Sequence, residues 1–220
     1  MMGKVLNKQI TDRICTLAEG QSRVLVSISG PPGAGKSTLA EQLERDINER
    51  MSENIAVILP MDGYHLDNAV LEERGQMKRK GAPHTFDVAG FAMLLERVKA
   101  GDQEVAVPVF DRSLDLSRAG ARIIDHSHQI VLVEGNYLLL DQPPWAALYS
   151  LFDLRLALEV DEGILTERLV QRWRDHGLPE DAAVNRAESN DLPNARLVAS
   201  RSQQADCIVS TTADGGYRIS

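Results

Sequence analysis

Short apolar runs alternate with amphipathic segments along most of this chain. Continuous apolar runs predict buried parallel strands at 24–29, 55–59, 129–133, 154–160 and 207–210. Apolar residues at helical spacing predict helices at 4–20, 38–52, 91–100, 161–176 and 194–204. Strands that alternate with helices in this way indicate an α/β fold, a doubly wound and mostly parallel five-stranded sheet with helices on both faces.

The remaining segments interrupt this alternation. Residues 105–110 and 121–124 predict a short accessory hairpin, and 217–219 an edge strand. Residues 62–87 have poor periodicity, and an irregular segment of this length inside a compact domain is usually functional. Residues 177–193 are polar and broken by glycine and proline, so we expect no regular structure there. A single domain over 1–220 is expected.

The composition limits which partners and which cellular compartment we expect for this protein. The chain has 220 residues and a net charge of −8, which argues against nucleic acid as the main partner because phosphate backbones attract basic surfaces. No apolar run reaches about 18 residues and the N-terminus has no signal-peptide core, so we expect a soluble, cytoplasmic protein with no membrane partner. Cys15 and Cys207 fit no metal or redox spacing, and we expect buried thiols.

A phosphate-binding loop of the Walker A type follows the first strand. Residues Gly30 to Ser37 have the pattern Gly, four residues, Gly-Lys-Ser between a strand and a helix. Backbone N–H groups and the helix N-terminus there suit phosphate oxygens, Lys36 reaches the β- and γ-phosphates, and Ser37 coordinates Mg²⁺. The predicted nucleotide-binding residues are Gly30, Gly33, Ala34, Gly35, Lys36, Ser37 and Thr38.

Two carboxylates stand at the ends of other predicted strands. Asp62 follows the second strand, and Glu134 follows the strand at 129–133. Ligands in such sheets bind at the carboxyl ends of strands, so both should line the crevice that holds the phosphate loop. We expect Asp62 to take the proton of a substrate hydroxyl and Glu134 to hold Mg²⁺, whereas the structural alternatives are a turn cap and a surface residue.

Arginines and an irregular segment supply further candidates. Arg168, Arg172 and Arg174 lie on the helix at 161–176, and we favour Arg172 and Arg174 as catalytic arginines of a lid over 172–193. The alternative is a solvated face that pairs with Glu167 and Asp175. Over 62–122 we expect an acceptor-binding insertion, with candidate substrate-binding residues Asp62, Tyr64, His65, Arg79, Lys80, His84 and Arg112.

Together these motifs resemble the P-loop small-molecule kinases that include uridine kinase, phosphoribulokinase and type I pantothenate kinase. Beside the phosphate loop, the resemblance rests on 61–65, 78–87, 133–137 and 168–174. It is strongest to uncharacterised members, some of which are called fructose-transport-system kinases. The resemblance implies ATP, Mg²⁺, a small-molecule acceptor with a hydroxyl group, lid arginines and often a homodimer.

Two departures leave the acceptor open. The chain is shorter than a typical pantothenate kinase, and residues 108–112 lack the aromatic and histidine pattern that uridine kinases present to the base. The segment Asn190-Asp191-Leu192-Pro193-Asn194 is distinctive of the uncharacterised members, and the sequence suggests no physical role beyond the base of the lid or the adenine pocket.

The leading hypothesis is a kinase that transfers the γ-phosphate of ATP to a hydroxyl group of a sugar, pantothenate-like or nucleoside acceptor. A GTPase would need an Asn-Lys-x-Asp motif, and a transporter ATPase a Ser-Gly-Gly-Gln signature; the sequence contains neither. An ATP-binding or NTPase regulatory module stays open as the alternative, and it predicts nucleotide binding without acceptor-dependent turnover.

Overall fold

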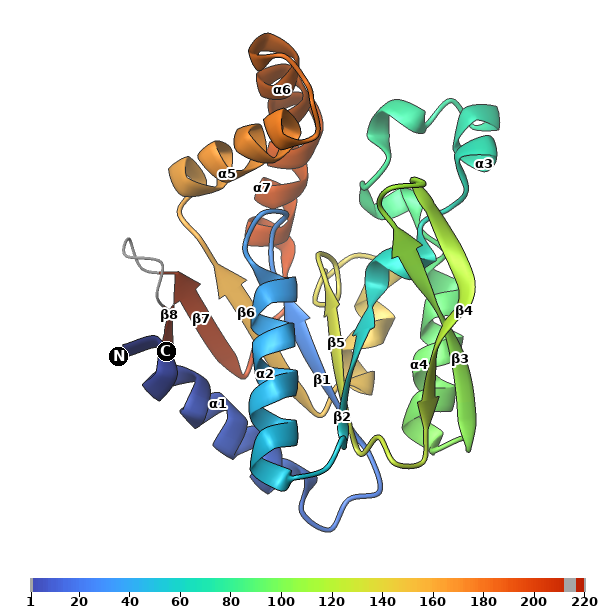
Figure 1. Ribbon diagram of the computed structural model, residues 1–220. Coiled ribbons are helices and arrows are strands. Elements are labelled where there is room, and N and C mark those ends of the chain that lie inside the picture. The colour runs from blue at the N-terminus through green and yellow to red at the C-terminus, as the bar shows by residue number, and fades with distance from the viewer. Residues whose placement is uncertain (1, 212–216, 220) are drawn as a thin grey trace.

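A six-stranded sheet forms the centre of the protein, in a computed structural model that describes residues 2–211 and 217–219 (Figure 1). The strand order is β2-β5-β1-β6-β7-β8. The bounds are β1 Val24–Ser29, β2 Ala56–Pro60, β5 Ile130–Gly135, β6 Leu154–Glu159, β7 Cys207–Thr211 and β8 Tyr217–Ile219. The first five strands are parallel, as expected, and β8 pairs antiparallel with β7 at the edge.

Helices cover both faces of this sheet, which confirms the predicted α/β architecture (Figure 1). Their bounds are α1 Met2–Ala18, α2 Lys36–Met51, α3 Asn68–Glu73, α4 Val88–Ala100, α5 Glu162–Asp175, α6 Glu180–Arg186 and α7 Leu192–Arg201. Alternate residues of a strand point to opposite faces, so Val24 and Val26 pack with α1 and α2, whereas Leu25 packs with α4. Within the described ranges, no helix is long and apolar enough to cross a membrane.

The accessory hairpin is present and longer than predicted. Strands β3 (Glu104–Asp111) and β4 (Leu116–Asp125) form a separate two-stranded antiparallel sheet. Figure 1 shows this hairpin beside α4, with its turn at the same end of the molecule as α3. The hairpin therefore brings residues near 112–115 toward the carboxyl ends of the main strands. Cys15 and Cys207 are buried free thiols, as expected.

Short helical turns make up much of the segment at 62–87. Besides α3, it contains η2 (Met77–Arg79), η3 (Pro83–Thr85) and most of η1 (Met61–Tyr64). A further 3₁₀ segment, η4 (Trp145–Leu151), covers the face that α4 covers. The expectation of poor periodicity is confirmed, because none of the four helical elements η1, α3, η2 and η3 exceeds six residues.

Residues 177–193 are largely helical, so the prediction of an irregular segment was wrong. Helix α6 continues into a π-helical turn, η5 (Ala187–Asp191), and then into α7. Pro193 lies in the first turn of α7, directly after the π-helical turn. Gly177, at φ 87°, provides the turn that separates α5 from α6. Proline and glycine here mark helix ends rather than a loop.

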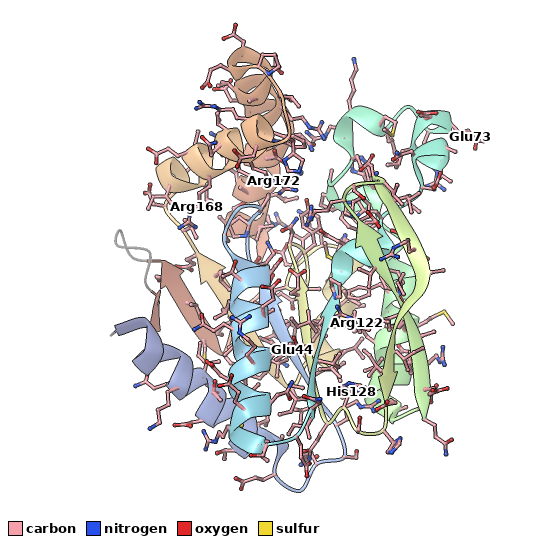
Figure 2. The ribbon with its side chains drawn as sticks, in the orientation of Figure 1. Glu44, Glu73, Arg122, His128, Arg168 and Arg172 are labelled. Atoms are coloured by element: carbon pink, nitrogen blue, oxygen red, sulfur yellow. The ribbon has the colours of Figure 1, made fainter. Side chains whose placement is uncertain are left out.

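Arg23, directly before β1, connects three segments of the chain by hydrogen bonds. Its side chain donates to the carbonyl oxygens of His128 (2.8 Å), Val98 (2.9 Å) and Asp125. The residue is only 7% exposed, and burial lowers the pKa of its guanidinium while Asp125 acts against that shift. Figure 2 shows His128 at the opposite end of the molecule from Arg172. Arg23 therefore supports the fold and not the site described below.

We predict that Arg23→Leu lowers the free energy of unfolding by about 2–4 kcal/mol, because three charge-assisted hydrogen bonds from one buried guanidinium are lost. Urea unfolding measures the change. The matched control is Arg45→Leu on the exposed face of α2, which should stay within about 0.5 kcal/mol of wild type, since arginine and leucine have similar helix propensities. Equal effects of the two substitutions would contradict the role assigned to Arg23.

Candidate active site

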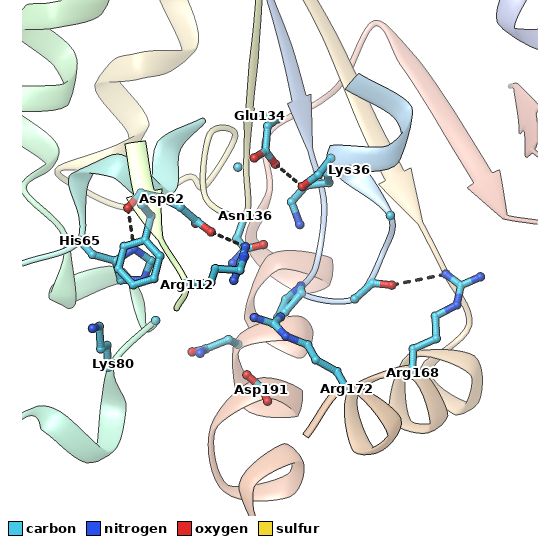
Figure 3. Close-up of a pocket in the computed structure, with 18 of the residues that line it drawn as sticks. Lys36, Asp62, His65, Lys80, Arg112, Glu134, Asn136, Arg168, Arg172 and Asp191 are labelled. Atoms are coloured by element: carbon cyan, nitrogen blue, oxygen red, sulfur yellow. Dashed lines mark hydrogen bonds and ion pairs between the residues drawn. The ribbon is translucent and has the colours of Figure 1, made fainter. Parts of the chain in front are cut away.

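Three strands end at one edge of the sheet, and the predicted site lies there. Strand β5 lies between β1 and β2, and its Glu134 is in register with Ile28 on one side and Pro60 on the other. The phosphate loop begins directly after β1, and Asp62 directly after β2. A cavity of about 440 Å³ opens at this edge (Figure 3). The parallel register alone thus brings the three predicted features together.

The phosphate loop has the backbone that its glycines require. Gly33 and Gly35 have φ values of 80° and 92°, a region that disfavours other residues. Gly35 is the N-cap of α2, which starts at Lys36 and directs its N-terminus at the cavity. A Cβ atom on Gly30 would lie 2.9 Å from the carbonyl oxygen of Leu158, so glycine is needed there for close approach of β6.

Lys36 and Glu134 are two opposite charges buried at the floor of the cavity. Lys36 is 8% exposed and donates from Nζ to the Pro31 carbonyl oxygen at 3.0 Å. Burial lowers its pKa to about 8, although the Glu134 and Asp62 carboxylates act in the other direction. Burial raises the pKa of Glu134, with Asp62 adding to the shift and Lys36 opposing it. Ser37 Oγ donates to Glu134 Oε2 at 3.4 Å.

Asp62 forms an ion pair across the cavity mouth. Its Oδ2 lies 2.9 Å from Arg112 Nη2, which comes from the hairpin (Figure 3). The Asp62 carbonyl oxygen accepts from His65 Nδ1 at 2.8 Å, so that ring nitrogen carries a proton. His65 is stacked between Phe86 (4.1 Å) and Phe110 (4.7 Å), and burial lowers its pKa against the pull of Asp62. A neutral histidine and two aromatic rings form one wall.

Lys80 lies at the same wall, but its ammonium group is already bound to other residues of the protein. Its Nζ donates to Asn68 Oδ1 at 2.6 Å and contacts both the carbonyl oxygen and Oδ1 of Asp115 at 2.8 Å. It also lies over the Phe110 ring, 5.0 Å from the centroid. Burial acts to raise the pKa of Asp115, but its hydrogen bonds to Lys80 and Asn68 prevail and lower it. Lys80 therefore joins the hairpin to α3.

Helix α5 stands over the phosphate loop, as Figure 2 shows for Arg168 and Arg172. Arg168 Nη1 donates to the Gly33 carbonyl oxygen at 3.4 Å. Arg172 lines the cavity, and its pKa is lowered first by burial and then by the charge of Arg112. Arg186 of α6 lines the cavity too, with its guanidinium 5.1 Å from the Trp173 ring. Cations therefore approach the cavity from three sides.

The structure brings most of the predicted site residues to this cavity. It is lined by Gly33, Gly35, Lys36, Ser37, Thr38, Asp62, His65, Lys80, Arg112, Glu134 and Arg172. The other predicted residues lie outside its lining: Gly30, Ala34, Tyr64, Arg79, His84 and Arg174. Gly30 and Ala34 belong to the turn of the phosphate loop, where Ala34 is buried and its N–H bonds to Pro31.

Of the residues outside the lining, three have clear surroundings. Tyr64 packs on Phe91 with ring centroids 4.8 Å apart, and burial raises its pKa. His84 is exposed. Arg174 points away from the cavity and pairs with Glu180 at 3.2 Å, with half of its side chain exposed. This placement separates Arg174 from Arg172, with which the sequence had grouped it.

Sequence reasoning missed several residues of the lining. The most informative are Asn136, Asp115, Trp173 and Arg186, whereas Asp191 and Asn194 also line the cavity and lie in the segment that the sequence singled out for the base of the lid or the adenine pocket. Asn136 follows Glu134 on the same strand end, so its place next to a motif residue was a usable signal. Asp115 and Arg186 give no such signal, because nothing in their local pattern states which distant segment they will meet.

These residues fit a magnesium nucleotide. The loop offers backbone N–H groups and a buried ammonium to phosphate, while Ser37 and Glu134 offer neighbouring oxygen ligands of the type that Mg²⁺ prefers. Among the residues that the structure describes, no group of three or more His, Cys, Asp or Glu could hold a metal ion by itself. That agrees with the habit of Mg²⁺ to bind through one or two carboxylates, water and phosphates.

The fold and the site together define the class of the P-loop kinases. The chain matches the model of the "Phosphoribulokinase / Uridine kinase family" over residues 25–214. It belongs to that family.

Similar proteins support this assignment. "Putative uridine kinase C227.14" of Schizosaccharomyces pombe is 33% identical over 209 residues, covering 91% of this chain and 88% of its own length. "Uncharacterized protein YggC" of Escherichia coli is 36% identical over 199 residues, covering 90% and 82%. A crystal structure from Silicibacter sp. TM1040, described as a "putative fructose transport system kinase", superposes with a TM-score of 0.81 at 43% identity, covering 89% and 98%. The names of these similar proteins differ: one says uridine kinase, one fructose transport system kinase, and one names no activity.

The buried ammonium of Lys36 predicts a pH-dependent stability. Its pKa is about 8 in the folded chain and near 10.5 when unfolded, so the unfolded chain holds more protons between these values and stability rises with pH there. From pH 7 to pH 10, we expect the unfolding free energy of wild type to rise relative to Lys36→Met by about 2 kcal/mol. Urea titrations at four pH values measure this. The control is Lys8→Met, at an exposed position on α1, whose unfolding free energy should differ from that of wild type by the same amount at every pH. If the unfolding free energies of wild type and Lys36→Met change with pH in parallel, the prediction is wrong.

Proposed function

We propose that this protein transfers the γ-phosphoryl group of ATP to a hydroxyl group of a small metabolite. One observation carries the proposal: a phosphate-binding loop, a carboxylate suited to be a base, and the half-buried Arg172 line one cavity of about 440 Å³. That volume lies in the range of small-molecule sites. Membership of a family of kinases supports the same reaction class.

The ATP side is assigned to the phosphate loop and to α5. Lys36 would hold the β- and γ-phosphates, and Ser37 with Glu134 would hold Mg²⁺, which when bound neutralises charge on the phosphates. Arg168 already contacts the loop at Gly33. Arg172 would stabilise the transferring group, because it is half-buried in the lining of the same cavity as the loop and near enough to Arg112 to feel its charge.

The acceptor side is assigned to the wall built by Asp62, His65 and Arg112. Asp62 would accept the hydroxyl proton while the acceptor oxygen bonds to the γ-phosphorus and ADP leaves. The ion pair with Arg112 orients the carboxylate of Asp62 before an acceptor arrives. Phe86 and Phe110 would exclude water from the reacting groups.

The segment over 172–193 is proposed as a lid, and 62–122 as the acceptor-binding part of one domain. Helices α5 and α6 stand above the strand ends, opposite α3 and the turn of the hairpin (Figure 1). The cavity is lined from both parts, by Arg172 and Arg186 on one side and by Lys80 and Arg112 on the other. Closure of such a lid shields the transfer from water.

The first test measures ATP consumption by the purified protein with a panel of hydroxyl metabolites: pantothenate, nucleosides, fructose and other sugars, glycerate and ribulose 5-phosphate. We expect one compound to stimulate turnover well above the background. Nucleotide binding without any stimulated turnover, across an extended panel, would favour the regulatory module that lacks a small-molecule acceptor.

Asp62→Asn tests the base. We expect this variant to bind MgATP like wild type in calorimetry, but to transfer the phosphoryl group about 10²–10⁴ times more slowly, because the proton has no acceptor. Asp102→Asn is the matched control, since Asp102 is exposed and pairs with Arg97 far from the cavity. An unchanged kcat in Asp62→Asn would remove Asp62 from the chemistry.

Arg172→Ala and Arg174→Ala form a second matched pair on one helix. Arg172→Ala should slow phosphoryl transfer at least about 10²-fold, because the cavity loses a half-buried cation from its lining. Arg174→Ala should change the rate less than about threefold, as expected of a surface ion pair. Initial rates at saturating MgATP decide between them. Equal losses in the two variants would overturn the placement of Arg172 as the lid arginine.

A further inference from the structure

The segment Asn190-Asp191-Leu192-Pro193-Asn194 connects the proposed lid to the acceptor side. It includes the end of the π-helical turn η5 and the start of α7. Asn190, Asp191 and Asn194 are 2%, 8% and 3% exposed, which is unusual for polar residues in a segment so near the surface. Turns of the π type are rare and often occur at functional sites. Their contacts indicate what these buried polar groups do.

Three successive residues of the loop at 78–81 bind this part of the lid. Arg186 Nη1 donates to the Lys78 carbonyl oxygen at 3.0 Å. Arg79 Nη1 donates to the Ser189 carbonyl oxygen at 2.8 Å. Asn190 Nδ2 donates to the Lys80 carbonyl oxygen at 2.9 Å. The loop and the lid are about 110 residues apart in sequence, so these bonds are purely tertiary.

Pro193 explains why the Ser189 carbonyl is available to Arg79. In an α-helix the N–H of residue i bonds to the carbonyl of residue i−4, and proline has no N–H. Ser189 is four residues before Pro193, so its carbonyl has no α-helical donor. The Arg79 guanidinium supplies one from the other side of the cleft. Proline in this motif thus creates the acceptor that the loop uses.

The same turn also holds the arginine-bearing helix. Asp191 Oδ2 accepts from Trp173 Nε1 at 2.5 Å, which ties η5 to α5. Two guanidiniums lie over the Trp173 ring, that of Arg172 at 5.7 Å and that of Arg186 at 5.1 Å from its centroid. Asp191 therefore fixes the ring on which both arginines rest. On the other side of the loop, Tyr137 OH donates to the Gly81 carbonyl oxygen at 2.6 Å.

We propose that Asn190 and Asp191 are positioning residues that couple the loop at 78–81 to Arg172. Asn190 holds the loop and Asp191 holds Trp173, so the arrangement of the acceptor wall and that of the lid arginine depend on each other. The coupling ensures that Arg172 reaches its position when the acceptor side is formed. The inference rests on the proposed function for its meaning in turnover, but not for its test.

Acrylamide quenching of tryptophan fluorescence tests the coupling without nucleotide or acceptor. The chain has two tryptophans, and Trp145 is 1% exposed, so quenching reports mainly on the half-buried Trp173. Subtracting the signal of Trp173→Phe isolates it. We expect Arg79→Ala and Asn190→Ala to raise the quenching constant of Trp173 about twofold or more, since couplings between distant sites commonly shift an equilibrium by such factors. Arg79 and Asn190 bond to the lid and to the loop rather than to Trp173, so an effect on Trp173 has to pass through η5 or through Arg186, which contacts both Lys78 and the Trp173 ring.

Two controls separate coupling from general damage. Arg74→Ala removes an exposed arginine five residues before Arg79 and should leave quenching unchanged. Thermal unfolding of each variant shows whether it is folded; if Asn190→Ala is not, Arg79→Ala alone decides. Unchanged quenching in a folded Arg79→Ala, or an equal rise in Arg74→Ala, overturns the proposal. A lower melting temperature with unchanged quenching also overturns the proposal, because a merely structural role predicts that result.

Substitutions of Asp191 test the second half of the connection. Asp191→Asn keeps an oxygen that accepts from Trp173, whereas Asp191→Ala removes it. We expect increased quenching only in the alanine variant, with rescue by asparagine. Equal quenching in the two variants would overturn the role of this hydrogen bond. Because the quenching experiment requires no turnover, its failure and the failure of the acceptor panel are separate results.

Discussion

The parallel register of β5 between β1 and β2 is the constraint on which the site depends. It aligns Glu134 with the residues that precede the phosphate loop and Asp62. Once these strands pair, an ammonium and two carboxylates must lie at one edge of the sheet. The connecting segments need only deliver further groups to a place that is already defined. This is the general reason why α/β sheets bind ligands at the carboxyl ends of their strands.

In the proposed function, phosphates and Mg²⁺ supply the charges that balance the charged side chains of this site. Lys36 and Glu134 are buried side by side, and burial shifts the pKa of each toward its neutral form. Burial of two charges is costly and does not by itself stabilise a fold. The cost has a use if phosphates and Mg²⁺ bind there, because preorganised groups of low exposure interact strongly with them. The pair at Asp62 and Arg112 is more open to solvent and more easily rearranged.

Whether a feature was predicted correctly depends on whether local sequence or contacts between distant residues decide it. The phosphate loop, the five parallel strands and the hairpin were predicted because hydrophobic period and glycine spacing are local properties. The helical segment at 180–191 was not, because glycine and proline look alike at helix ends and in loops. Arg172 and Arg174 were grouped by proximity, although residues two apart on a helix point in nearly opposite directions. Helical geometry alone could have separated them.

By itself the sequence determined the phosphate loop, the position of Asp62 and Glu134 after predicted strands, and the kinase family to which the chain belongs. Only the tertiary structure decided that Asp115 meets Lys80, that Arg186 reaches the cavity, and that Asn190 holds a loop about 110 residues away. The physical reason is that periodicity states which face of an element is buried, but not which distant element covers it. Those partners are chosen when the elements pack.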